Sequence, residues 1–136
     1  MYPKEIISPM KSEMTEQGFK ELLTAEDADV LKQPGTSLLF INSVCGCSAG
    51  TARPGVLMAV QNATKKPDQL LTSFAGYDVE AVKAARNYLL PYPPSSPAIA
   101  LLKDGQVVHM IERHMIEGRP AQMIASNLMQ AFEQHC

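Results

Sequence analysis

The stretch Ser37-Leu38-Leu39-Phe40-Ile41-Asn42-Ser43-Val44-Cys45-Gly46-Cys47 joins a short apolar run directly to two cysteines that flank one glycine. An apolar run bounded by turn residues predicts a strand buried on both faces. Residues 47–62 then show apolar side chains at helical spacing, and Pro54 predicts a kink or a restart in that helix. The two cysteines therefore lie where a strand ends and a helix begins, which is where open α/β sheets place their chemistry.

The remaining downstream elements follow from hydrophobic periodicity and turn residues. Asp78 is expected to cap the next helix, and Asp104-Gly105 between two apolar runs predicts a hairpin. The predicted elements are a strand over residues 70–75, a helix over 78–90, two strands over 98–102 and 107–111, and a helix from Pro120 to the end.

The predicted order is β-α-β-α-β-β-α, with a right-handed parallel crossover first and an antiparallel hairpin last. This is the order of a thioredoxin-like α/β fold, with a central mixed sheet of about four strands flanked by helices. Residues 1–35 predict an N-terminal helical extension, with helices over 3–17 and from Thr24, where Asp27 completes a variant capping box. No linker or repeat divides the chain, so we expect one domain over residues 1–136.

The composition excludes several classes of protein. With 46% hydrophobic and 19% charged residues among 136, the chain can bury a core. A net charge of −2 without a basic run argues against nucleic-acid binding. The sequence shows neither an apolar stretch of about 20 residues nor a secretory signal. We therefore expect a cytoplasmic protein that does not bind membranes.

The cysteines suit thiol–disulfide chemistry, because cytosolic cysteines are seldom structural disulfides. A helix N-terminus stabilises a thiolate, so we expect Cys45 to attack as the nucleophile and Cys47 to resolve the mixed disulfide. Gly46 leaves room for an incoming sulfur. Two alternatives remain open: both cysteines could be buried small hydrophobes, or they could hold a soft ion such as zinc or copper(I) with Cys136 or a histidine.

Other residues are candidates for supporting roles. Ser96-Pro97 precedes a strand of the hairpin, and a cis proline there would press against the cysteine turn. Arg53 either favours a thiolate or a substrate carboxylate, or forms a structural ion pair. His114 and Glu117 form a polar group near the site or lie on the surface. Cys136, at the end of a helix, should have a raised pKa, and is either a bystander or a reserve thiol.

These residues also support a comparison with a known family. The chain resembles the bacilliredoxins over essentially its whole length, through Asn42-Ser43-Val44-Cys45-Gly46-Cys47, Ala49-Gly50, Ala52-Arg53-Pro54, Phe74-Ala75-Gly76, Pro94-Ser95-Ser96-Pro97, Arg113-His114, Ile116-Glu117-Gly118 and His135-Cys136.

The resemblance implies a thioredoxin-like reductase that removes bacillithiol from protein mixed disulfides. Cys45 would take the bacillithiol, Cys47 would release it, and Ser96-Pro97 matches the cis-proline position of the family. It implies no bound cofactor or metal. The partners would be thiolated client proteins, a low-molecular-weight thiol as co-substrate, and a reductase that regenerates that thiol. Protein disulfide isomerase activity is the alternative enzyme function.

Overall fold

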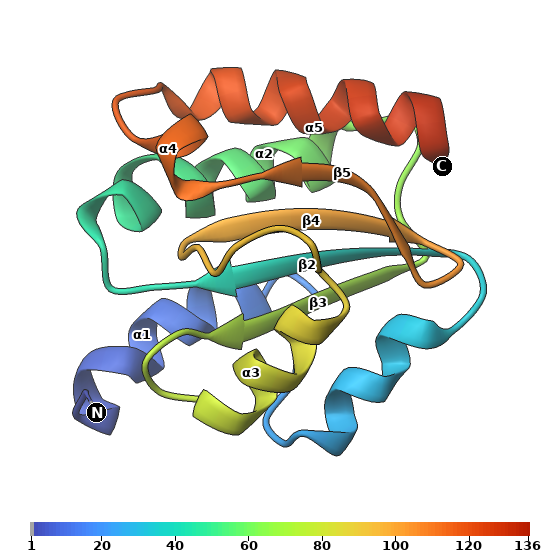
Figure 1. Ribbon diagram of the computed structural model, residues 1–136. Coiled ribbons are helices and arrows are strands. Elements are labelled where there is room, and N and C mark those ends of the chain that lie inside the picture. Colours follow the sequence, from blue (N-terminus) through green and yellow to red (C-terminus); the bar gives the residue numbers. More distant parts are fainter. Residues whose placement is uncertain (1) are drawn as a thin grey trace.

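The computed structural model describes residues 2–136, and its centre is a mixed sheet of five strands in the order β1-β3-β2-β4-β5 (Figure 1). β3 is parallel to both β1 and β2, whereas β4 is antiparallel to β2 and β5. The strands are β1 (Lys20–Glu21), β2 (Thr36–Asn42), β3 (Gln69–Phe74), β4 (Ala98–Lys103) and β5 (Gln106–Ile111).

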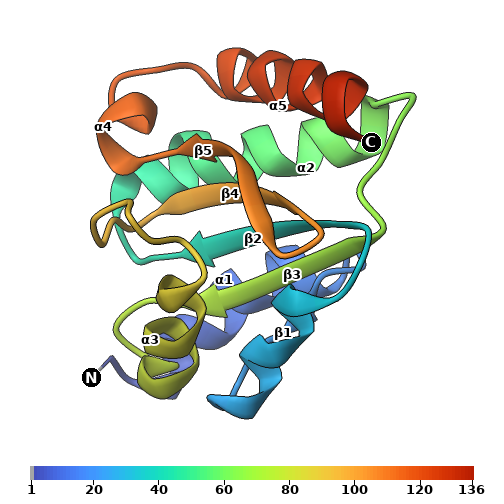
Figure 2. The same cartoon turned by 45° about the vertical axis from the view of Figure 1, so that its right-hand side comes forward.

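Helices cover both faces of the sheet. In Figures 1 and 2, α2 and α5 lie side by side over one face, and α3 and η1 lie on the other. The helices are α1 (Lys4–Thr15), the 3₁₀-helix η1 (Glu26–Lys32), the π-helical turn η2 (Ser48–Ala52), α2 (Arg53–Asn62), α3 (Val79–Asn87), α4 (Arg113–Ile116) and α5 (Ala121–His135). The predicted order β-α-β-α-β-β-α is confirmed, with α4 as an additional short helix.

The strand β2 is central and buried along its whole length. Its side chains alternate between two cores: Leu38 and Phe40 pack with α2 and α5, whereas Leu39 and Ile41 pack with η1 and α3. Because neighbouring strands and helices exclude water from both faces, a continuous apolar run is stable here. This arrangement explains why the run that precedes the cysteines has no polar alternation.

The sheet has one strand more than the sequence predicted. The segment over residues 1–35 is not helical throughout, because Lys20 and Glu21 form β1 and pair with Leu71 and Thr72 of β3. The Leu22 amide extends this pairing with a hydrogen bond of 2.8 Å to the Thr72 carbonyl oxygen. Two residues are too short to show a strand pattern, so only the tertiary pairing reveals β1.

Side-chain caps were expected at the starts of η1 and α3. Thr24 and Asp27 exchange the expected bonds: the Thr24 amide donates to Asp27 Oδ2 (3.0 Å), and the Asp27 amide donates to Thr24 Oγ1 (3.2 Å). Asp78 is the N-cap residue of α3, as expected, but its side chain makes no capping hydrogen bond. Its carboxylate instead accepts from the Phe74 amide (3.0 Å) and pairs with Lys11 of α1 (2.9 Å), because this partly buried cation lies within reach.

Within residues 2–136, no helix combines the length and the apolar character that crossing a membrane requires.

Candidate active site

The two neighbouring cysteines lie at the point where β2 gives way to a helix. The Cys45 carbonyl oxygen accepts hydrogen bonds from the amides of Ser48 (2.9 Å) and Ala49 (3.3 Å), which makes Cys45 the residue at the helix start. The π-helical turn η2 continues into α2, and Pro54 is the second residue of α2. Pro54 thus lies where the helix restarts as an α-helix, and both cysteines are partly buried at the helix N-terminus.

The environment of Cys45 favours its thiolate. Hydrogen bonds from the Cys47 thiol and the Cys47 amide, together with the positive charge of Arg113, lower the pKa of Cys45 against an opposing effect of burial. The Cys47 amide nitrogen lies 3.4 Å from Cys45 Sγ. Hydrogen bonds to the charged form and a nearby cation are the two causes that depress a thiol pKa.

The environment of Cys47 does the opposite. Burial, the hydrogen bond of its thiol to Cys45 and the charge on Cys45 raise the pKa of Cys47 to about 11. The pair therefore loses its first proton from Cys45, while Cys47 keeps its proton. This difference allows one thiol to attack while the other waits in its neutral form.

A buried polar network under the loop fixes its path. The Asn42 side-chain oxygen accepts from the Ser43 amide (2.8 Å), the Ser48 hydroxyl (2.9 Å) and Arg53 Nη1 (3.0 Å). The Cys45 amide in turn donates to the Ser43 hydroxyl oxygen (2.9 Å). Asn42 and Ser48 are completely or almost completely buried, so these bonds replace lost contacts with water.

Arg53 belongs to this network and not to the surface near the thiols. Its guanidinium is buried, and Nη1 also donates to the Ser43 carbonyl oxygen (3.1 Å). Its Nε lies 2.6 Å from Glu13 Oε2 of α1, an ion pair without a well-aligned hydrogen bond. Of the two interpretations that the sequence left open, the structure supports the structural ion pair, with Arg53 positioning the loop.

A cavity of about 330 Å³ opens beside Cys45. Its walls include Val44, Gly76 and Ser96, which come from three loops far apart in the sequence. The Ser96–Pro97 peptide bond is cis, as expected from its sequence position, and Leu90–Pro91 is also cis. Ser96 therefore lies at the candidate site, while the roles assigned to Ser96 and Pro97 remain predictions.

Arg113, at the start of α4, also lines this cavity, although it was not among the candidate site residues. The predicted topology could have placed Arg113 near Cys45. β5 runs in the same direction as β2, so the residues that follow these two strands lie at the same end of the sheet. His114 and Glu117 line an adjoining cavity, and their supporting roles stay predictions. Glu117 pairs with Arg113 (2.5 Å) and contributes to the raised pKa of Cys47.

Cys136, for which the sequence left a bystander or a reserve role open, lies at the other end of the sheet from this centre. Its surroundings include Thr36, where β2 begins, whereas Cys45 follows the end of β2. A strand of seven residues separates these ends by about 20 Å. Burial raises the pKa of Cys136. Cys136 is therefore not a third ligand beside Cys45 and Cys47, and residues 2–136 contain no metal-ligand cluster of three or more His, Cys, Asp or Glu side chains.

Comparison with known proteins identifies the relatives of the chain. The model of a family described as "Disulphide isomerase" matches residues 2–136. Proteins named bacilliredoxin are similar: that of Cytophaga hutchinsonii is 56% identical over 135 residues (98% of this chain, 99% of the relative). That of Salinibacter ruber is 49% identical over 138 residues (99% and 81%), and one of Bacillus licheniformis is 47% identical over 137 (99% and 95%).

Solved structures agree with the architecture. Oxidised mitochondrial thioredoxin 3 of Saccharomyces cerevisiae superposes with a TM-score of 0.56 at 18% identity, covering 90% of this chain and 99% of that one. Fasciola hepatica thioredoxin gives a TM-score of 0.57 at 17% identity, covering 87% and 100%. Similarity at this level of identity establishes the thioredoxin-like fold.

An activated thiol at the end of a central strand, on this fold and in this family, is the arrangement of a thiol–disulfide oxidoreductase. The chain belongs to the disulphide isomerase family, together with the bacilliredoxins that it resembles along nearly its whole length.

Proposed function

We propose that the protein reduces mixed disulfides between client proteins and a low-molecular-weight thiol, and that this thiol is bacillithiol. The observation that carries the proposal is the opposite shift of two thiol pKa values, lowered for Cys45 and raised for Cys47. The relatives named bacilliredoxin support the choice of thiol. The reaction requires a reducing compartment, and we propose the cytoplasm.

In the first step the Cys45 thiolate attacks the sulfur of the bound low-molecular-weight thiol. A Cys45–thiol disulfide forms, the client disulfide breaks, and the client cysteine leaves as a thiolate that takes a proton from water. The thiol and the amide of Cys47 both donate to the sulfur of Cys45 in the resting protein. The oxidation state of the pair of sulfurs is unchanged, because one disulfide replaces another.

In the second step Cys47 loses its proton and attacks Cys45 Sγ, which releases the small thiol and forms the Cys45–Cys47 disulfide. Two molecules of the small thiol then reduce this disulfide and become the symmetrical small disulfide. A separate reductase would return that product to the thiol. The negative charge of Cys45 is one cause of the high pKa of Cys47. Cys47 therefore loses its proton more readily once Cys45 is in a disulfide and no longer charged, which places its attack second.

Disulfide isomerase activity is the second candidate, and the description of the matched family favours it. An isomerase would restore a scrambled protein while the total number of protein disulfides stays constant. A reductase would lower that number in proportion to the small thiol that is consumed.

Mass spectrometry of a model protein carrying a bacillithiol mixed disulfide tests the proposal. Wild type should free the model protein, Cys47→Ala should retain bacillithiol on Cys45, and Cys45→Ala should be inactive. Cys136→Ala serves as the matched control and should behave as wild type, because this thiol lies at the opposite end of the sheet. Absence of transfer to any variant would overturn the proposal, and retention on Cys47 in Cys45→Ala would reverse the roles.

A further inference from the structure

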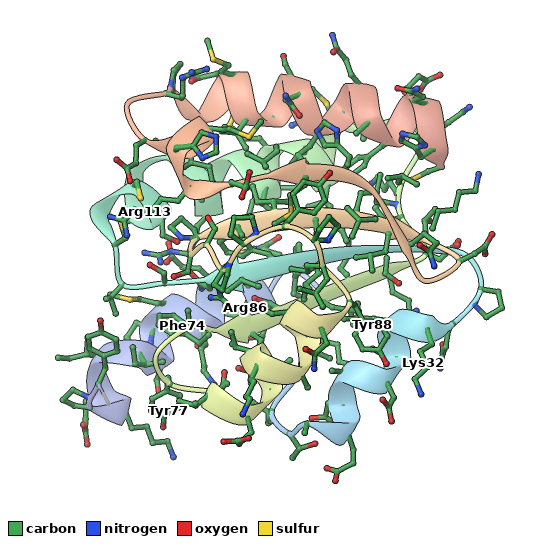
Figure 3. All side chains as sticks on the ribbon, viewed as in Figure 1. Lys32, Phe74, Tyr77, Arg86, Tyr88 and Arg113 are labelled. Carbon is green, nitrogen blue, oxygen red and sulfur yellow. The ribbon has the colours of Figure 1, made fainter. Side chains whose placement is uncertain are left out.

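The cavity beside Cys45 adjoins a second and larger cavity, of about 490 Å³, which the reaction described above does not use. Ser96 and Arg113 line both cavities, so the two share one wall. The second cavity extends to Arg86 on α3, and Figure 3 labels Arg86 and Arg113. A molecule whose sulfur lies at Cys45 can therefore extend between these two arginines.

Arg86 is a cation without a protein partner in this cavity. Its side chain is half-buried, and its pKa is lowered by burial. Among residues 2–136 it forms neither an ion pair nor a side-chain hydrogen bond, unlike Arg53 and Arg113. A position in the last turn of α3 suits a positive charge, but it does not require the guanidinium to lose contact with water. The unpaired guanidinium is suited to a ligand anion.

Arg113 is paired, but its partner can be replaced. Glu117 contacts Arg113 at 2.5 Å, and both side chains are about half exposed (50% and 54%). Ion pairs with this exposure contribute little to stability, so a second carboxylate can displace Glu117 at small cost. The Ser95 hydroxyl oxygen already accepts from the Arg113 amide (2.7 Å), which leaves its proton free to donate to a ligand.

We propose that this second cavity binds a carboxylate of the small thiol, so that the enzyme prefers thiols that carry a carboxylate within reach of their sulfur. Arg86 and Arg113 are the recognising residues, because a guanidinium binds a carboxylate through two parallel hydrogen bonds. Glu117 competes with the ligand for Arg113. The inference rests on the proposed function, since it assigns the class of small thiol that the same site releases.

Glutathione and its dimethyl ester provide a matched pair of probes, because they differ in their carboxylates and share one thiol. Each is coupled as a mixed disulfide to the same model protein, and the rate of release of the model protein is measured with full-length enzyme. The ratio of the two rates is divided by the ratio obtained with dithiothreitol, an uncharged reductant. This normalised preference cancels differences in intrinsic reactivity and in the folded fraction of a variant.

We expect wild type to prefer the acid form, and Arg86→Gln to lower that preference about three- to tenfold. Arg86→Lys should retain part of it, and Glu117→Gln should increase it. Lys83→Gln is the matched control, since Lys83 is an exposed cation on the same helix and outside the cavity. The Lys83→Gln variant should prefer the acid form as strongly as wild type does. This result would show that the effect of Arg86→Gln comes from a local contact and not from the loss of one positive charge in general.

The outcomes separate this inference from the proposed function. Equal preference in wild type and Arg86→Gln, with both mixed disulfides reduced, overturns the carboxylate site and leaves the reductase intact. Failure of wild type on both probes and on the bacillithiol disulfide overturns the proposed function itself. A coenzyme A mixed disulfide tests phosphate recognition: an equal dependence on Arg86 would show that the cavity recognises negative charge in general, and would overturn the preference for carboxylates.

Discussion

The backbone amide of Cys47 donates a hydrogen bond to Cys45 Sγ across 3.4 Å, while the Cys47 thiol donates a second bond to the same sulfur. One cysteine thus stabilises the charge on the other with two groups, and it can do so because only Gly46 separates them. The closeness that makes a disulfide between them feasible also makes the two thiols chemically different before any substrate arrives.

Alkylation of the three cysteines should follow the order of their pKa values. The pKa of Cys45 is lowered, that of Cys47 is raised to about 11 and that of Cys136 is also raised. A lower pKa gives more thiolate at neutral pH, so iodoacetamide should modify Cys45 first and Cys47 only in strong alkali. Peptide mapping over a range of pH measures this order. Modification of Cys47 before Cys45 would contradict the assigned roles.

The charges at the start of α4 should tune the thiols in opposite directions. Arg113 lowers the pKa of Cys45, so Arg113→Gln should raise it and slow alkylation at neutral pH. Glu117 raises the pKa of Cys47, so Glu117→Gln should lower it. Thiolate absorbance in the ultraviolet reports both titrations. Arg119→Gln, an exposed control, should leave both unchanged, and a shift in that variant would indicate a nonspecific effect.

Arg53→Met should destabilise the fold by about 2–4 kcal/mol, because the buried oxygens of Asn42 and Ser43 lose a charged donor. Urea unfolding measures the change. Lys83→Gln, on the surface, should stay within about 0.5 kcal/mol of wild type. A loss below about 1 kcal/mol in Arg53→Met would show that water replaces the guanidinium in the network.

Two glycines of one helical segment should respond differently to alanine. A Cβ at Gly55 would lie 2.8 Å from Ile124 Cβ and 3.0 Å from the Ala121 carbonyl oxygen of α5. Gly55→Ala should therefore cost about 1–3 kcal/mol, since α2 and α5 must separate. At Gly50 a Cβ meets no atom within 4 Å, so Gly50→Ala should be neutral or stabilising by up to about 1 kcal/mol. Thermal unfolding of both variants compares them, and equal losses would refute the close approach of the helices.

The parts of the fold that could be predicted from sequence are those with a strong local pattern. Three elements have a pattern that is readable within a few residues: the apolar run of β2, the turn Asp104-Gly105 of the hairpin, and the helical spacing of apolar residues in α5. The position of Cys45 follows directly from the end of β2. The strand β1 escaped prediction because its two residues acquire their structure only by pairing with β3.

The candidate site was predictable only in its centre. Cys45 and Cys47 carry a motif, whereas Arg86 and Arg113 lie 27 residues apart in sequence (113 − 86) and share a cavity only after the sheet has formed. The role of Arg53 could not be decided from spacing, because its partners Asn42 and Glu13 belong to other elements. Burial of Asp78 beside Lys11 likewise replaced an expected local cap with a tertiary ion pair.

The strand order described above leaves β1 and β5 at the two edges of the sheet. Open edges are templates for aggregation, because unpaired backbone groups can bind a strand of another molecule. Here one edge is only two residues long and carries an exposed lysine, Lys20, and the other is irregular opposite Leu101 and Leu102. Both features disfavour edge-to-edge addition of a strand from a second molecule, so the sheet is protected from growth at its two edges.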